Sequence, residues 1–466
     1  MLFFKIKNLG VCKQTLNIFV QIFLFFHATK TNFKHLFNKQ LNKSQMKNVI
    51  FLFLSILNLG LVSCTDDDDS KYADYQVAIP LTISKAEFKK GGKVLAPKFI
   101  EESGKMYTYK KYIFINDKSQ GIHIIDNRNP KFPKKIAYIQ IPGNVDISVK
   151  NDLLYADSLT DLLVIDISNI DNIRVVNRLE NVLNGYVVWP MDVDIYDYNT
   201  LNGIDYENEI LVGWKTVTER RLISEVQDRL WGWGNEFSLS NMASSSDAAT
   251  VGQGGSMARF KIVEDYLYAV DDNFINIFNI QDAKNPKALE PVFAGFQIET
   301  IFNLGENLFL GSRIGMYIYN ISNPAMPSLV SEFSHGTACD PVVADENYAY
   351  VTLRGGNACG AAESELLIID IKDLANPTLL KSYPMDGPYG LGIKNNMIFV
   401  CDGDSGLKVY DKTDVMNLKP LNHFKNIITF DVIPLENSLL MVGDEMLFQY
   451  EYLENKINLL SSLSLK

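Results

Sequence analysis

Short apolar runs alternate with polar turns along this chain, and the alternation recurs at roughly 40 residues, the size of one structural unit in many repeat proteins. The clearest part of each unit is a run of β-branched, Leu and aromatic residues that ends in Asp or Asn. It occurs at residues 121–126, 162–168, 275–280, 316–324, 366–371 and 407–411. Runs of this composition, bounded by turn residues, predict antiparallel strands.

Each unit predicts four strands. The second strand carries an aromatic residue, as at Tyr155 and Tyr268, and the fourth follows an Asn-Pro turn, as at residues 379–383. The Asp or Asn that ends the third strand can accept a hydrogen bond from the backbone of its own turn, and Pro marks the corner because it lacks an N–H. One four-stranded sheet cannot bury both faces, so the units are expected to stack around an axis.

We therefore predict an all-β chain that forms a β-propeller over residues 73–466, most simply with seven four-stranded blades. Six or eight blades are the alternatives, and a horseshoe or β-helix is the competing fold. The blades are expected to start near residues 104, 143, 256, 299, 338, 387 and 428. The last is degenerate, and we expect a strand at residues 75–83 to complete its sheet and close the ring.

A long insertion, residues 182–255, separates the second and third predicted blades. We expect strands at 187–196 and 209–214, a helix-compatible stretch at 218–230, and a flexible Ser/Ala/Gly stretch at its end. Trp214, Trp231 and Trp233 lie in this insertion. Exposed Trp often marks a contact surface, so Trp231 and Trp233 are candidates for binding a sugar ring or a partner chain. The alternative is a solvated loop without a role.

Residues 46–63 have the features of an export signal, with a basic tip, a short apolar core and Ser63 before Cys64. A Cys at this position resembles the bacterial lipobox, which implies that Cys64 is lipidated and becomes the mature N-terminus. The alternative is an ordinary signal peptide followed by a coincidental Cys. The apolar core is too short to span a bilayer, so the lipid would supply the anchor. Residues 64–72 form an acidic, solvated tether.

Residues 1–45 are Lys-rich and lie upstream of a complete signal, so we expect Met46 to be the true start. The alternative is a membrane segment around residues 16–26, which is short for that purpose. Residues 1–63 contain eight Lys and no Asp, Glu or Arg, so their removal takes the net charge from −11 to −19. A protein this acidic repels phosphate backbones, which argues against nucleic acid as a partner.

Of the five Cys, two bracket one predicted hairpin, Cys339 and Cys359. They form a disulfide or remain free, because sequence does not give the distance between them. A metal pair is less favoured, since His335 stands alone nearby. Cys401 lies in an apolar strand and is expected to be a buried small hydrophobe.

Candidate ligand-binding residues follow from aligning the units on their second-strand aromatics. The alignment brings four residues near the axial mouth of the ring: Asp146, Arg259, Asp340 and Asp431. Acids beside an Arg can hold a cation or a polar ligand. The alternative is that they satisfy backbone groups around the central channel.

The phrase Leu-Leu-Val-Ile-Asp-Ile-Ser at 162–168, repeated in part at 366–371, resembles the LVIVD repeat. The stretches 210–214, 254–260 and 339–343 resemble lipoproteins of Bacteroidota that carry this repeat. The resemblance implies a lipidated extracytoplasmic β-propeller, and the acidic block after Cys64 is similar to the export signal of their surface lipoproteins. It implies no reaction.

The chain contains no nucleophile elbow, zinc-protease helix, phosphate loop or haem attachment motif. We therefore name no catalytic residue, no resident metal and no cofactor. The leading hypothesis is a non-enzymatic binding or scaffold module for an envelope protein or glycan, anchored in the outer membrane and displayed on the surface, with the periplasmic face as the alternative. The rival is a surface hydrolase or lyase with a metal at Asp146, Asp340 or Asp431.

Overall fold

The computed structural model describes residues 71–185, 187, 189–190, 193–224, 251–335, 341–355 and 363–466. Contacts divide the chain into two units, and the larger comprises Tyr75–Glu219 and Trp233–Lys466. All sheets described below lie in this larger unit, apart from the outer ends of β1 (Tyr72–Ser84) and β12 (Glu209–Leu222). The unit is all-β, as predicted, with short helices such as α4 (Lys85–Phe88) and α5 (Tyr198–Asn202).

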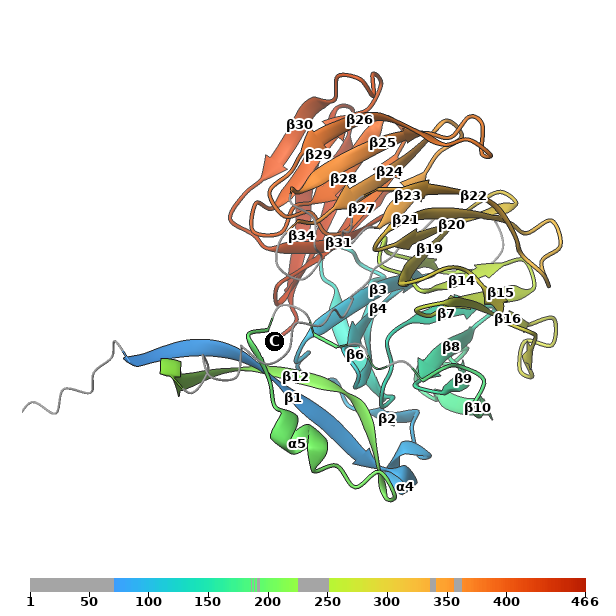
Figure 1. The fold of residues 1–466 in the computed structure, drawn as a ribbon, viewed down its shortest axis with the longest axis vertical. Coiled ribbons are helices and arrows are strands. Elements are labelled where there is room, and N and C mark those ends of the chain that lie inside the picture. Colours follow the sequence, from blue (N-terminus) through green and yellow to red (C-terminus); the bar gives the residue numbers. More distant parts are fainter. Residues whose placement is uncertain are drawn as a thin grey trace, which may run out of the picture. The chain divides into compact units, whose positions relative to one another are not determined.

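Consecutive strands form seven antiparallel sheets in the described residues, numbered here in chain order (Figure 1). Sheet 1 contains β3 (Ser103–Tyr109), β4 (Tyr112–Asp117), β5 (Gly121–Asp126) and β6 (Lys134–Gln140), extended by β2 (Lys93–Leu95) and β13 (Gln253–Gly254). Sheet 2 contains β7 (Ile147–Lys150), β8 (Leu153–Ser158), β9 (Asp161–Asp166) and β10 (Arg174–Leu179). Sheet 3 contains β14 (Phe260–Val263), β15 (Tyr266–Val270), β16 (Phe274–Asn279), β17 (Lys287–Ala288) and β18 (Val292–Phe293).

The remaining sheets each have four strands in sequence order. Sheet 4 contains β19 (Ile298–Leu304), β20 (Asn307–Ser312), β21 (Gly315–Asn320) and β22 (Ser328–Ser334). Sheet 5 contains β23 (Val342–Ala344), β24 (Tyr348–Leu353), β25 (Glu365–Asp370) and β26 (Thr378–Pro384). Sheet 6 contains β27 (Leu391–Lys394), β28 (Met397–Cys401), β29 (Leu407–Asp411) and β30 (Lys419–Phe424). Sheet 7 contains β31 (Thr429–Pro434), β32 (Ser438–Gly443), β33 (Met446–Leu453) and β34 (Lys456–Ser464).

The first strands of these sheets contact one another in a cyclic order. Going round, β3 contacts β7, and the contacts continue through β14, β19, β23, β27 and β31, which returns to β3. Each sheet therefore covers the face of its neighbour, which is how repeated sheets bury surfaces that none can bury alone. The arrangement is propeller-like.

The Asp or Asn at the end of the third strand acts as predicted. In sheets 1 to 6 its side-chain oxygen accepts a hydrogen bond from the backbone N–H two residues later. The bond survives where Asn279 and Asn320 replace Asp, because an amide oxygen is also an acceptor. Because this turn is formed by residues close together in the sequence, the repeat can be recognised from the sequence.

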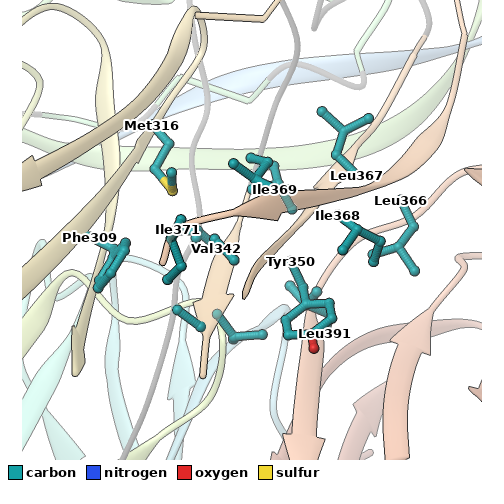
Figure 2. Packing of buried hydrophobic residues seen from close by; sticks show 14 of the residues in the cluster. Phe309, Met316, Val342, Tyr350, Leu366, Leu367, Ile368, Ile369, Ile371 and Leu391 are labelled. Carbon is teal, nitrogen blue, oxygen red and sulfur yellow. The ribbon is translucent and has the colours of Figure 1, made fainter. Parts of the chain in front are cut away.

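The core lies between adjacent sheets. Figure 2 shows one cluster, in which Phe309 and Met316 of sheet 4 lie close to Ile371, at the end of the third strand of sheet 5. Tyr350 and Leu391 belong to the same cluster, so it continues into sheet 6. Replacing a fully buried Phe such as Phe309 with Ala lowers the free energy of unfolding by roughly 3–5 kcal/mol.

The predicted strand at 75–83 exists, but its predicted position was wrong. β1 pairs with β11 (Ile195–Tyr196) and β12 in a three-stranded sheet, and it does not pair with sheet 7. Sheet 7 does not need β1 to complete it, because β34 is its fourth strand and buries Ile457. Next to it, Ile100 N donates to Leu465 O at 2.9 Å, so the segment before β3 packs against the end of the chain.

The expectation of a helix-compatible stretch from residue 218 was wrong up to Leu222, where β12 ends, whereas residues 223–224 are helical. Pairing with β1 determines the structure here, which is a case of long-range contacts overriding local propensity. The expected strand at 187–196 is reduced to Ile195–Tyr196 within the described residues.

Candidate functional site

Three of the predicted binding residues lie in the described part of the chain, namely Asp146, Arg259 and Asp431. The others lie outside the described residues, as do the predicted lipidation and disulfide positions: Asp340, Trp231, Trp233, Cys64, Cys339 and Cys359. The structure brings Asp146 and Arg259 together and places Asp431 on the first strand of sheet 7.

Asp146 ties the start of sheet 3 to sheet 2. Its carboxylate is 3 % exposed and accepts hydrogen bonds from the backbone N–H of Arg259 and, at 2.9 Å, of Phe260. Asp157, at the end of β8, accepts in turn from Val145 N and Asp146 N, both at 2.9 Å. Burial raises the pKa of Asp146, and it raises the pKa of Asp157 to about 6.

Asp431 likewise holds another part of the chain through hydrogen bonds to its carboxylate. We call these arrangements at Asp146 and Asp431 the axial clamps. Its carboxylate accepts from Ser256 N at 3.0 Å, from Ser256 Oγ at 2.6 Å and from Met257 N at 3.2 Å. Burial raises its pKa to about 7. A Cβ on Gly255 or Gly390 would overlap this carboxylate, so both positions need Gly for the backbone to approach it.

Residues 251–259, which we call the return segment, lead from the undescribed residues 225–250 back to β14. The segment contacts the first strands of several sheets. Gly252 N donates to Val149 O of sheet 2 at 2.8 Å, and Gly255 N donates to Met106 O of sheet 1 at 3.0 Å. Its other bonds reach sheets 6 and 4: Leu391 N to Ser256 Oγ at 2.7 Å and Ile301 N to Ala258 O at 3.2 Å. A segment bonded to so many first strands lies where those strands converge.

Lys105 is a charged residue that the sequence reasoning missed. Its ammonium is buried on β3 without a hydrogen-bond partner among the described residues. Burial lowers its pKa to about 7, and the charge of Asp146 opposes that shift. The available signal was a Lys in a first strand that is otherwise small or apolar, beside Gly104 and Met106. We call Lys105, Asp146, Asp157, Arg259 and Asp431 the axial cluster.

The three-stranded sheet carries a group of aromatic rings. Trp189 and Trp214 lie with ring centroids 4.4 Å apart, and Tyr196 is 5.6 Å from Trp214 and 6.0 Å from Tyr198. Trp214 is only 6 % exposed, so it is not the exposed contact residue that its type suggested, whereas Tyr198 is 51 % exposed. We call these four residues the aromatic cluster. Trp189 was overlooked in the sequence, where all four Trp fall between residues 182 and 255.

This sheet is packed against sheet 2 and sheet 1. Val212 of β12 shares a buried cluster with Phe88 and with Leu159 of sheet 2. Gly213 lies against Ser119, in the turn after β4, so closely that a Cβ would overlap the Ser119 side chain. The base of β12 is therefore held firmly, which gives the nearby aromatic cluster a fixed position.

Cys401 is buried, as predicted, and is not in a disulfide; burial raises the pKa of its thiol. In the described ranges, no group of three or more His, Cys, Asp or Glu side chains is placed to hold a metal ion. Within the same ranges, no helix has the length and apolar character needed to cross a bilayer.

Comparisons with known proteins bear on the repeat. The LVIVD repeat matches residues 143–178 and 335–384. No curated protein matches the chain. Similar solved structures include Kluyveromyces lactis Hsv2 (10 % identity over 78 % of this chain and 100 % of that one, TM-score 0.44). They also include a functionally unknown protein from Desulfotomaculum acetoxidans (10 % identity over 77 % of this chain and 95 % of that one, TM-score 0.45). A third is Saccharomyces cerevisiae Sqt1 (9 % identity over 82 % of this chain and 88 % of that one, TM-score 0.45). The two matched stretches contain the phrases at 162–168 and 366–371, so the repeat predicted from those phrases is confirmed.

Proposed function

We propose that this protein is a lipid-anchored binding module of the bacterial cell envelope, with no reaction of its own. The ring is a seven-bladed propeller made of sheets 1 to 7, with an insertion between the second and third blades. The cyclic contacts of the first strands and the four-stranded antiparallel sheets support this architecture. The insertion presents the surface that meets the partner.

The observation that carries this proposal is the aromatic cluster. It lies on a sheet that the repeats do not require, and that sheet is fixed to the ring through Val212 and Gly213. Tyr and Trp provide large contact areas at a low cost in side-chain entropy, which is why they dominate the energetics of protein interfaces. Tyr198 offers such a surface with half of its side chain exposed. The partner we expect is an envelope protein.

The rival function, a hydrolase or lyase with a metal at Asp146, Asp340 or Asp431, has less support. The carboxylates of Asp146 and Asp431 already accept two or more backbone hydrogen bonds each, as expected of residues that hold loops. Metal analysis of the purified protein, combined with an activity screen, separates the two functions. A stoichiometric metal and turnover lost in Asp431→Asn would favour the enzyme.

Anchoring at Cys64 rests on the sequence that surrounds it. Cells expressing the full chain should incorporate labelled palmitate into the protein, and Cys64→Ser should abolish the label and release the protein from the membrane fraction. Protease added to intact cells then distinguishes outward display from the periplasmic face. Equal membrane retention and labelling of the Cys64→Ser form would contradict the anchor.

Partner binding is tested with point variants, because deleting the insertion would also remove residues 251–255 of the return segment and their bonds to the ring. We expect cross-linking of the anchored protein in whole cells to yield a defined adduct. Tyr198→Ala should reduce this adduct at least fivefold. The matched control is Phe132→Ala, at an aromatic residue of sheet 1 that is even more exposed. Equal loss in both variants, or no loss in either, would contradict the role of the aromatic cluster.

A further inference from the structure

The seam between sheets 5 and 6 has a charged residue at a position that is uncharged in the other sheets. In sheets 2 to 5, the residue after the Asp or Asn of the third strand is a buried Ile, no more than 6 % exposed: Ile167, Ile280, Ile321 and Ile371. Each of these packs in a cluster that joins its own sheet to the preceding one. In sheet 6 the same position is Lys412, the only charged residue there among the seven sheets, since sheet 1 has Asn127 and sheet 7 has Tyr452.

The preceding sheet carries a matching change. Three residues before its second strand, sheet 4 has Leu304, which packs in the same cluster as Ile371. Sheet 5 has Asp345 at that position, and its Oδ2 lies 2.7 Å from the Nζ of Lys412. The Lys412 side chain is 13 % exposed and that of Asp345 is 26 % exposed. A largely buried ion pair is seldom more stable than the apolar contact it replaces, so stability does not account for this change.

A groove of about 390 Å³ opens at this seam. Its walls are the turn before β24, the turn after β25 and the turn after β29, with Asn347, Tyr348, Lys372, Thr413 and Met416 among its lining residues. The volume lies in the range of small-molecule sites. A charged pair at a position that is apolar in most repeats, accompanied by a cavity, is where a functional site is expected in a repeat protein.

Two ion pairs lie in the groove, and a third carboxylate, that of Asp414, accepts hydrogen bonds from its own turn. Lys412 pairs with Asp345, and Lys372 pairs with Asp370 at 2.7 Å. Tyr350 donates its hydroxyl to Asp345 Oδ2 at 2.8 Å, which adds to the buried polar floor. An anionic ligand would have to break one of these pairs. A neutral ligand with many hydroxyl groups can donate to the carboxylates and accept from the ammonium groups while both pairs persist.

The groove also has an aromatic side. Tyr348 is half-buried, and the Nζ of Lys372 lies 4.6 Å from its ring centroid and 3.4 Å from its hydroxyl. Lys372 is 53 % exposed, so its flexible side chain can move when a ligand enters. A tyrosine ring combines an apolar face with a polar tip, and sugar rings likewise have an apolar face bordered by hydroxyl groups.

From this geometry we propose that the groove between sheets 5 and 6 binds a neutral carbohydrate. A sugar ring lies against Tyr348, and its hydroxyl groups bond to Asn347, Asp345 and Lys412. This site differs from the aromatic cluster and does not rest on the protein-binding role given to that cluster. The two proposals are independent, so an experiment can contradict one of them without contradicting the other.

The test uses the full chain, purified in a detergent without a sugar headgroup. Probes are neutral gluco-, galacto-, manno- and N-acetylglucosamine oligosaccharides of two to four units, with oligogalacturonate as the charged comparison. Isothermal calorimetry should show saturable binding of at least one neutral probe. Tyr348→Ala should weaken it at least tenfold. The matched control is Tyr266→Ala, at the same repeat position in sheet 3, and it should leave binding unchanged.

A double variant tests the seam itself. Asp345→Leu combined with Lys412→Ile imports the apolar pair found between sheets 4 and 5 (Leu304 and Ile371). The double variant should unfold at a temperature close to that of the wild type, and its affinity for carbohydrate should fall at least tenfold. Unchanged binding in the double variant or in Tyr348→Ala would overturn the proposal, as would binding of oligogalacturonate alone or of no probe. Tyr198→Ala should bind carbohydrate normally, which keeps this test separate from that of the proposed function.

Discussion

Carboxylates are held in two different ways at the axis and at the seam between sheets 5 and 6. Asp146 and Asp431 are almost completely buried and accept hydrogen bonds from backbone N–H groups. Asp345 is partly exposed, pairs with Lys412 and borders a groove. The first arrangement fixes the chain, whereas the second leaves polar groups where a ligand can reach them. Burial and partner type therefore distinguish a structural acid from a binding acid, although both are simply Asp in the sequence.

The largest effect on this comparison is expected from Asp431→Ala. It leaves the buried donors of Ser256, Met257 and Val432 without their acceptor, and buried unsatisfied groups cost roughly 1–3 kcal/mol each. We expect the free energy of unfolding to fall by at least about 3 kcal/mol in chemical denaturation. Asp414→Ala, at an exposed acid of the groove that accepts hydrogen bonds only from its own turn, is the control and should lower the free energy of unfolding by at most about 1 kcal/mol. Similar midpoints for both variants would remove the distinction.

Gly390→Ala tests the same clamp by crowding the Asp431 carboxylate with an added Cβ. The added Cβ would overlap the Asp431 carboxylate and the Ser256 hydroxyl, and overpacking of this kind costs typically 1–3 kcal/mol. We expect a loss of about 2 kcal/mol by denaturant titration. Gly387→Ala is the matched control, because a Cβ there meets nothing within 4 Å. Equal stability of the two variants would contradict the close approach at Asp431.

The axial cluster also predicts an unusual dependence of stability on pH. Burial raises the pKa of Asp431 to about 7, above its unfolded value near 4, so the folded state binds the extra proton and stability falls as pH rises from about 4 to 7. Burial lowers the pKa of Lys105 to about 7, so the unfolded state binds the extra proton and stability rises from about pH 7 to 10. Each slope is at most about 1.4 kcal/mol per pH unit.

We therefore expect a minimum of the free energy of unfolding near pH 7, measured by denaturant titration at fixed ionic strength. Asp431→Asn should reduce the slope on the acidic side of the minimum, to which Asp146 and Asp157 also contribute. Lys105→Met should reduce the slope on the basic side, to which Lys261 also contributes. Profiles that keep the same shape in both variants would show that neither group titrates in these windows.

The repeat could be predicted from sequence because its turns are local. The Asp or Asn at the end of each third strand bonds to its own turn, so the signal lies within a few residues. The position of β1 could not be predicted, since its pairing with β11 and β12 joins segments more than 100 residues apart. β34 was missed because the repeat phrase lacks its Asp at Glu451, although residues 456–464 have the alternation of a strand.

The axial residues were brought together by aligning repeats, but their bonds to the return segment could not be predicted. Those bonds depend on where a segment of irregular sequence crosses the first strands. Lys412, in contrast, could have been found without a structure. Four repeats place Ile after the motif Asp or Asn, and Lys412 is the only charged residue at that position among the seven units. Departures from a repeat thus carry information about a site that the repeat itself does not.

The smallest expected effect on stability comes from separating the two members of the groove pair. Lys412→Ile alone leaves Asp345 partly buried beside an apolar residue and should lower the free energy of unfolding by roughly 1–2 kcal/mol. Adding Asp345→Leu should restore it to within about 1 kcal/mol of the wild type, because an apolar contact often matches an ion pair of this kind. The double-mutant cycle is read from denaturant titrations of all four proteins. If the double variant were instead the least stable of the four, the pair would be structural like the axial clamps. The contrast between the axis and this seam would then fail.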